Sequence, residues 1–89
     1  MTQKLTHLRK QLDEIDDGIL VLLDKRMKLA VKIAEVKKKI GKPILDIVRE
    51  EDLFQKLKDR NKKTILPDEK MLEIWGKIVE LSREMQERC

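Results

Sequence analysis

The stretch that decides the fold runs from residue 5 to residue 40, LTHLRKQLDEIDDGILVLLDKRMKLAVKIAEVKKKI. Its apolar residues recur at alternating intervals of three and four positions, with one interruption: Leu5, Leu8, Leu12, Ile15, Ile19, Leu22, Leu29, Ile33, Val36 and Ile40. This spacing predicts a single continuous helix that buries one apolar seam along its whole length. The stretch contains no proline, and Gly18 is its one residue of severely low helix propensity.

The interruption in this seam is a charged residue. Between Leu22 and Leu29 the spacing requires an apolar residue at position 26, and Arg26 occupies it. A guanidinium on a buried seam costs several kcal/mol unless another group pairs with it. One interpretation is structural: a buried carboxylate partner, or a side chain that extends to solvent at a helix crossing. The other interpretation is that Arg26 binds a ligand.

The length of the helix bears on assembly. A helix from about residue 4 to residue 40 is about 54 Å long. A compact chain of 89 residues has a radius of gyration of only about 12 Å. The seam therefore needs cover from outside its own chain. We expect a homodimer in which the long helices run antiparallel about a two-fold axis.

Two shorter helices follow the long one. Gly41-Lys42-Pro43 predicts the end of the first helix, because glycine suits a left-handed cap and proline prevents continuation. Asp46 is a good N-cap for a second helix over residues 47 to about 61. Pro67 suits the first position of a third helix, over about residues 67–88. The fold class is therefore all-α, one domain over residues 1–89, with a long, a short and a medium helix.

The shorter helices also carry apolar faces. Leu53, Phe54 and Leu57 are expected to point inward, and Ile65 and Leu66 of the connecting loop to pack back onto the core. The third helix has a stripe of Met71, Ile74, Trp75, Ile78, Leu81 and Met85. Two polar residues four positions apart, Ser82 and Gln86, share one side of this stripe near its end.

Composition excludes several classes of protein. No stretch approaches the about 18 apolar residues of a membrane span, and the start of the chain lacks the apolar run of a signal peptide. The one cysteine, Cys89, permits no intrachain disulfide, which agrees with a reducing compartment. We expect a soluble, cytoplasmic protein that binds no membrane. His7 has no metal-ligand spacing around it, and no glycine-rich phosphate loop is present, so no metal or cofactor is expected.

Three cations of the long helix suggest a binding site shared between chains. Arg26 and Lys37 are eleven residues apart, which is close to three turns, so they project to one side. Arg9 lies about 25 Å from Arg26 and about 42 Å from Lys37 along the axis, so it cannot join them within one chain. In an antiparallel dimer with its two-fold axis near residues 18–23, Arg9 of the partner subunit would arrive between Arg26 and Lys37.

Four residues of the shorter helices can face the same cavity: Arg49, Glu50, Ser82 and Gln86. Such a pocket is strongly cationic, with one carboxylate and two neutral donors. It suits a small dianion, above all a dicarboxylate, because arginine forks match carboxylates bidentately.

These segments resemble a known family, the all-helical (AroQ-type) chorismate mutases. LRKQLDEID (8–16) resembles the LRxxIDxID opening of that family, and LLDKRMKLA (22–30) matches its LLxxRxxLA segment. Lys37 followed by PILDIVRE (43–50) resembles its K…PIxDxxRE signature, and Ser82 to Gln86 falls where the family has a polar pair. The similarity covers nearly the whole chain. Leu45 stands where some members have a polar or basic residue.

The resemblance implies a fold and a reaction. The fold is three helices in an intertwined homodimer with two equivalent active sites, each built from both chains. The reaction is the Claisen rearrangement of chorismate to prephenate, an isomerisation in phenylalanine and tyrosine biosynthesis that needs no cofactor, nucleophile or proton transfer.

The resemblance also implies roles for the polar residues. Arg9 from the partner chain and Arg26 would grip the two carboxylates. Lys37 would bind a carboxylate and the ether oxygen of chorismate, and Gln86 would donate to that same oxygen.

The remaining roles concern the rim of the site. Arg49 would shape the electrostatic field and, with Ser82, support the carboxylate end. Glu50 and the backbone at Asp46 would hold the ring hydroxyl.

Three alternatives stay open at this point. An isochorismate–pyruvate lyase of the same fold would use a similar cationic pocket. A non-catalytic helical interaction module would pair Arg26 with a carboxylate in a filled core. Nucleic-acid binding is suggested by Lys37-Lys38-Lys39 and the net charge of +4, but 17 interspersed acidic residues and only 2% aromatic residues argue against it.

Overall fold

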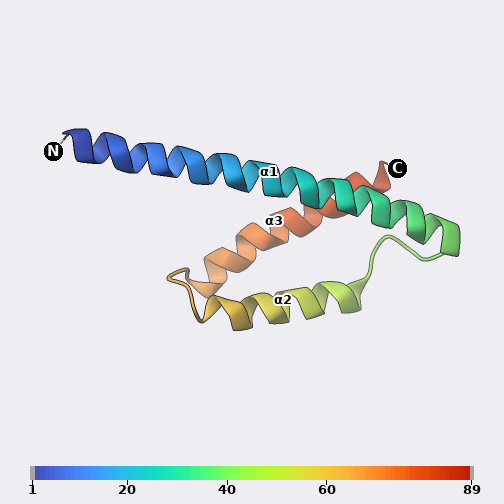
Figure 1. Ribbon diagram of the computed structural model, residues 1–89. Coiled ribbons are helices and arrows are strands. Elements are labelled where there is room, and N and C mark those ends of the chain that lie inside the picture. Colours follow the sequence, from blue (N-terminus) through green and yellow to red (C-terminus); the bar gives the residue numbers. More distant parts are fainter. Residues whose placement is uncertain (1, 89) are drawn as a thin grey trace.

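The computed structural model describes residues 2–88, which form three helices (Figure 1): α1 Thr2–Ile40, α2 Ile47–Asn61 and α3 Asp68–Glu87. These residues contain no strand, so the prediction of a long, a short and a medium helix is confirmed. Helix α1 begins two residues earlier than expected, and α3 ends one residue earlier, at Glu87. Cys89 lies outside the described residues.

Pro67 is the N-cap of α3 and not its first helical residue, which corrects the predicted start. Its backbone is extended, with φ −62° and ψ 134°. Proline has no N–H to donate, but its carbonyl oxygen still accepts the first helical bond, from the Met71 N–H at 3.0 Å. The helix therefore starts at Asp68, one residue later than the sequence suggested.

The turn between α1 and α2 forms as the sequence predicts. Gly41 has a positive φ of 73°, and the Lys42 N–H donates to the Lys37 carbonyl at 2.9 Å, which closes the end of α1. The Asp46 carboxylate accepts a bond from the Arg49 N–H at 3.0 Å and so caps the start of α2. These two caps fix the short segment that returns the chain beside α1.

The turn between α2 and α3 is organised by a buried side chain, Asn61. Its Nδ2 donates to the Leu66 carbonyl at 2.9 Å and to Asp68 Oδ1 at 2.6 Å, and Thr64 Oγ1 donates to the Asn61 carbonyl at 3.1 Å. These bonds direct the loop outward, with Ile65 100% and Leu66 50% exposed. The expectation that Ile65 and Leu66 pack back onto the core is therefore wrong for this chain.

Helix α3 is the centre of the packing. Its backbone lies close to those of both α1 and α2, whereas the backbones of α1 and α2 do not approach each other within residues 2–88. The buried apolar side chains are few and mostly small: Met27, Ala30 and Ala34 from α1, and Met71 and Val79 from α3. Helices α1 and α3 cross (Figure 1), and the small size of the two buried alanines suits a close approach of α3 to α1.

The faces buried within one chain coincide only in part with the apolar stripes of the sequence, and the seam of α1 was expected to need cover from another chain. On α1 the residues of the apolar seam stay exposed by about half or more, and the face against α3 is the adjacent one. On α3, Ile74 and Leu81 of the predicted stripe are 59% and 41% exposed, while Val79 and Ser82 are buried. The chain therefore leaves its most apolar seam uncovered.

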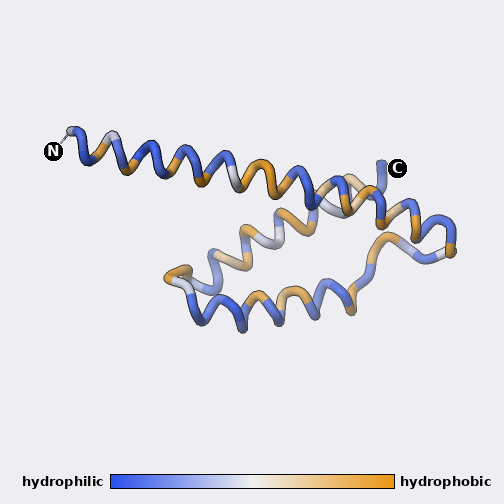
Figure 2. The backbone as a smooth tube through the Cα atoms, viewed as in Figure 1, coloured by the Kyte–Doolittle hydropathy of each residue, from blue (hydrophilic) through white to orange (hydrophobic). Residues whose placement is uncertain are grey.

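The molecule is elongated. Its extents are 59 × 26 × 15 Å and its radius of gyration is 16.8 Å, against about 12 Å for a compact chain of this length. Every residue from Thr2 to Leu22 is exposed, and this half of α1 extends past α2 and α3 (Figure 1). Figure 2 shows apolar segments recurring along this half of α1. None of the described helices is long and apolar enough to cross a membrane.

Candidate active site

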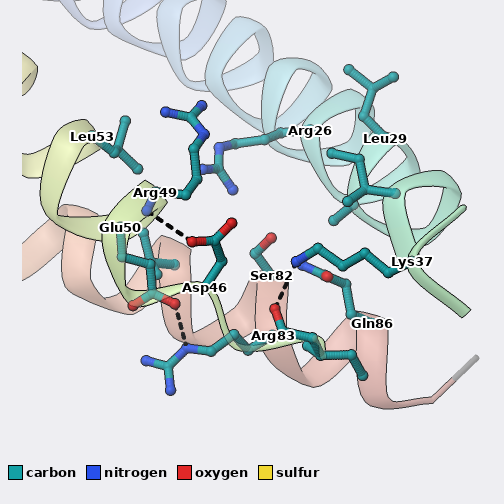
Figure 3. A pocket seen from close by; sticks show the side chains of 14 residues that line it. Arg26, Leu29, Lys37, Asp46, Arg49, Glu50, Leu53, Ser82, Arg83 and Gln86 are labelled. Atoms are coloured by element: carbon teal, nitrogen blue, oxygen red, sulfur yellow. Dashed lines mark hydrogen bonds and ion pairs between the residues drawn. The ribbon is translucent and has the colours of Figure 1, made fainter. Parts of the chain in front are cut away.

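A cavity of about 430 Å³ lies between the three helices (Figure 3). This volume is within the range of about 300–1,000 Å³ typical of small-molecule sites. Its apolar wall is made by Leu29, Ala30, Ile33, Ile44, Leu53 and Val79. Its polar residues are Arg26, Lys37, Asp46, Arg49, Glu50, Ser82, Arg83 and Gln86.

Seven of the eight residues that the sequence singled out lie around this cavity. The exception is Arg9, which lies on the exposed half of α1, 17 positions before Arg26. That separation corresponds to about 25 Å along the helix. Arg9 therefore does not reach the cavity of its own chain, as the helix geometry had indicated.

Sequence reasoning missed one charged residue of the cavity, Arg83. It lies three positions before Gln86, a helical spacing that places two side chains on one side, and this was the available signal. The apolar wall was missed as well, because its residues come from all three helices and the intervening loop.

Arg26 is half-buried at the edge of the cavity. Its guanidinium carbon lies 5.7 Å from the centre of the Trp75 ring, which is the geometry of a cation–π contact. Burial and, secondarily, the nearby positive charge of Arg49 lower the pKa of Arg26. Within residues 2–88 no carboxylate lies within 4.0 Å of Arg26. Of the two structural interpretations, the one that pairs Arg26 with a carboxylate is therefore not met within these residues.

Lys37 is fixed by the loop that joins α1 to α2. Its Nζ donates to the backbone carbonyl of Ile44 at 2.7 Å, and its side chain lies along the cavity (Figure 3). An ammonium has three N–H donors. This bond therefore orients the charge of Lys37 and leaves two donors for a ligand.

Glu50 is held across the cavity by α3. Its Oε2 lies 3.3 Å from Nε of Arg83, and Figure 3 marks this pair. The geometry is that of an ion pair and not of a well-directed hydrogen bond, since Arg83 Nε is buried without a hydrogen-bond partner among the described residues. The other ion pairs within residues 2–88 join residues three or four positions apart, within one helix or at its end, so this pair alone connects α2 to α3.

Two polar side chains of α3 are buried in the cavity. Ser82 and Gln86 are only 9% and 8% exposed. Oε1 of Gln86 is buried and has no hydrogen-bond partner among residues 2–88. Buried polar atoms are nearly always paired, so an unpaired one in a cavity indicates a place for a ligand or for another chain.

The charges around the cavity favour an anion. Arg26, Lys37, Arg49 and Arg83 face two carboxylates, those of Asp46 and Glu50, which gives the lining a net charge of +2. The lining has no histidine or cysteine. No cluster of three or more histidine, cysteine, aspartate or glutamate side chains suited to a metal occurs in residues 2–88. The arrangement can bind, orient and electrostatically stabilise a dianion.

Comparisons with known proteins agree with this geometry. The family described as chorismate mutase type II matches residues 8–87. A chorismate mutase of Methanocaldococcus jannaschii is 32% identical over 88 residues, which cover 99% of this chain and 89% of that protein. A bifunctional chorismate mutase/prephenate dehydratase of Aquifex aeolicus is 35% identical over 89 residues, and the match spans only 25% of its length.

The fold has a close counterpart among solved structures. Chorismate mutase (form II) from Thermus thermophilus superposes with a TM-score of 0.91 at 30% sequence identity, covering 96% of both chains. The resemblance drawn from the sequence segments is thereby confirmed. The chain belongs to the chorismate mutase type II family.

Proposed function

We propose that this protein catalyses the Claisen rearrangement of chorismate to prephenate. The observation that carries the proposal is the cavity with a net charge of +2, in which Arg26 has no carboxylate partner among the described residues. Chorismate carries two carboxylates, so its charge complements that of the lining. Membership of the chorismate mutase type II family supports the same substrate.

The rearrangement requires the substrate to be held in a compact conformation. A flexible dicarboxylate reaches that conformation only at a cost in entropy, and tight positioning by charged groups offsets this cost before the reaction. In this proposal Arg26 and Arg9 of the partner subunit bind the two carboxylates. Arginine is suited to this task because its planar fork donates two parallel bonds to a carboxylate.

Lys37 and Gln86 would stabilise the transition state. As the ether C–O bond breaks, negative charge accumulates on the ether oxygen, and preorganised donors aimed at that oxygen lower the barrier. The Lys37 ammonium and the buried Gln86 amide both border the cavity, one from α1 and one from α3. The bond from Lys37 to the Ile44 carbonyl fixes its position before substrate arrives.

The other polar residues would complete the site. Arg49 and Ser82 would support the carboxylate end. Glu50 and the backbone at Asp46 would bind the ring hydroxyl, with Glu50 held by Arg83 at 3.3 Å.

The proposal includes a homodimer. The exposed seam of α1 and the distance of Arg9 from its own cavity support an antiparallel pairing of the α1 helices, with a two-fold axis near residues 18–23. In that arrangement Arg9 of the partner subunit would enter the cavity between Arg26 and Lys37. Each cavity would then be completed by the other chain.

The test is the loss of chorismate absorbance, with prephenate identified as the product, for wild type, Arg26→Ala and Lys28→Ala. Lys28 is an exposed cation two residues away that pairs with Asp24 at 2.8 Å, so it is the matched control. We expect rapid conversion by wild type and by Lys28→Ala, and at least about a 100-fold loss in Arg26→Ala. A folded wild type that leaves chorismate unchanged would refute the proposal, and isochorismate would then be tested as the substrate.

A further inference from the structure

The contact that holds Arg26 in place comes from outside the cavity. Trp75 of α3 is half-buried and does not line the cavity, yet its ring centre lies 5.7 Å from the Arg26 guanidinium carbon. Trp75 is also the only tryptophan in the chain. Its aromatic face therefore lies behind a cavity cation that pairs with no carboxylate among the described residues.

The other cations of the cavity each lie within 4.0 Å of an oxygen atom of the chain. Lys37 donates to the Ile44 carbonyl at 2.7 Å, Arg83 lies 3.3 Å from Glu50, and the Arg49 guanidinium lies 3.7 Å from Asp52. Arg26 differs from all of them. It has no such contact within residues 2–88, and burial together with Arg49 disfavours its charge.

The choice of partner matters for ligand binding. A carboxylate beside Arg26 would occupy its fork and neutralise its charge, so a substrate would have to displace it. An aromatic face attracts the cation through its quadrupole and uses none of its N–H donors. A ring can therefore orient the guanidinium and leave its five donors free for an incoming carboxylate.

We propose that Trp75 is a positioning residue, which holds Arg26 in the orientation that binds a substrate carboxylate and leaves its donors unoccupied. The inference rests on the proposed function, because it assigns Arg26 to a carboxylate of chorismate. Trp75 acts through Arg26 and does not itself touch the substrate.

The first test separates the ring face from mere bulk. Trp75→Leu keeps an apolar side chain but removes the ring, and we expect kcat/KM to fall about three- to tenfold, the range of a modest cation–π contact. The change should appear mainly as a higher KM, because Arg26 would bind the substrate carboxylate equally well in the ground state and in the transition state. Trp75→Phe restores a ring face and should recover kcat/KM to within about twofold of wild type.

The second test is a double-mutant cycle with Arg26→Gln. If Trp75 acts through Arg26, the double variant Arg26→Gln/Trp75→Leu should be no less active than Arg26→Gln. Met71→Ala is the control, since Met71 is buried on the same face of α3 one turn earlier and does not line the cavity. Its effect on kcat/KM should be small and independent of Arg26.

Each result distinguishes the two proposals. If wild type is active, a KM that is unchanged in Trp75→Leu would overturn the positioning role. Effects of Trp75→Leu and Arg26→Gln that multiply in the double variant would overturn it as well. Either result would leave the mutase function intact. If Trp75→Leu does not fold, Trp75→Met, which also lacks a ring, takes its place in the same cycle: coupling to Arg26 supports the role, and effects that multiply overturn it. A wild type without mutase activity would refute both.

Discussion

Arg26 shows how one residue can connect the fold to the function. By sequence it lies on the apolar seam of α1, and in the structure it borders the cavity. The pKa of its guanidinium is lowered, and the ring of Trp75 lies behind it. A lowered pKa means that folding disfavours the charged form of a cation. This unfavourable contribution to the free energy of folding is fully present below the folded-state pKa of Arg26. It therefore acts over the whole pH range in which the arginine is charged. A bound dianion would remove much of it.

Replacing Arg26 should therefore harm activity and not stability. In Arg26→Met the side chain keeps its length and loses the penalised charge, an effect worth at most about 1 kcal/mol after solvent screening. We expect the free energy of unfolding, measured with urea at fixed protein concentration, to stay within about 0.5 kcal/mol of wild type or to rise. A loss of about 3 kcal/mol would instead show that Arg26 is one half of a buried ion pair.

The proposed role of Gln86 predicts how the kcat of a Gln86→Glu variant depends on pH. Gln86→Glu introduces a carboxyl at a site that is 8% exposed, where burial raises the pKa of a carboxyl and the cations of the cavity lower it. Only the protonated acid can donate to the ether oxygen, so kcat should be nearly lost at neutral pH and should recover as the pH falls through the pKa of this carboxyl.

The control is Gln55→Glu, because Gln55 is exposed on α2. It should keep the pH profile of wild type. A profile of Gln86→Glu that is as flat as that of Gln55→Glu would show that Gln86 does not donate to the reacting oxygen.

At the scale of the helices, the sequence predicted more about where elements begin and end than about which face is buried. The three helices follow from apolar spacing and from caps such as Asp46 and Gly41, which are local signals. The buried face of α1 could not be found that way, because Ala30 and Ala34 pack closely through small size, while the strongest periodicity marks the uncovered seam.

The candidate site was predictable in part for similar reasons. Arginine, lysine and polar residues out of place in an apolar pattern are visible in a sequence, and seven of those predicted lie around the cavity. The partner of Glu50 was not visible, because Arg83 meets it only when α2 folds back on α3. The outward path of Ile65 was also hidden, since it depends on the hydrogen bonds of Asn61.

The α2–α3 turn gives the prediction at this scale. Asn61 is 6% exposed and bonds to Leu66 and Asp68, so Asn61→Ala removes the donor of two part-buried hydrogen bonds and should lower the free energy of unfolding by about 1–3 kcal/mol. Activity per folded molecule should not change, because Asn61 does not line the cavity.

Urea denaturation at fixed protein concentration measures the effect. Lys62→Ala is the control, since Lys62 forms only an exposed pair with Asp59 at 3.4 Å, and it should cost less than about 0.5 kcal/mol. Equal effects of the two substitutions would contradict the role of Asn61 in fixing the turn.

The whole molecule exposes more surface than an isolated compact chain should. Its accessible area is 7812 Å², whereas a compact monomer of this size exposes about 5,500 Å². The excess is concentrated on α1, where residues such as Leu12, Ile15 and Ile19 are 52–58% exposed. A second copy that covers this seam would also bring its Arg9 toward the cavity, so assembly and chemistry are linked in the proposal.

The most direct test of this linkage mixes two inactive variants, Arg9→Ala and Arg26→Ala. In an intertwined dimer the mixed pair has one cavity with both substitutions and one cavity with neither. Random reassociation after joint refolding makes about half of the dimers mixed, so the mixture should regain about a quarter of wild-type mutase activity. A mixture no more active than its separate components, or an Arg9→Ala variant as active as wild type, would contradict a site completed by the partner chain.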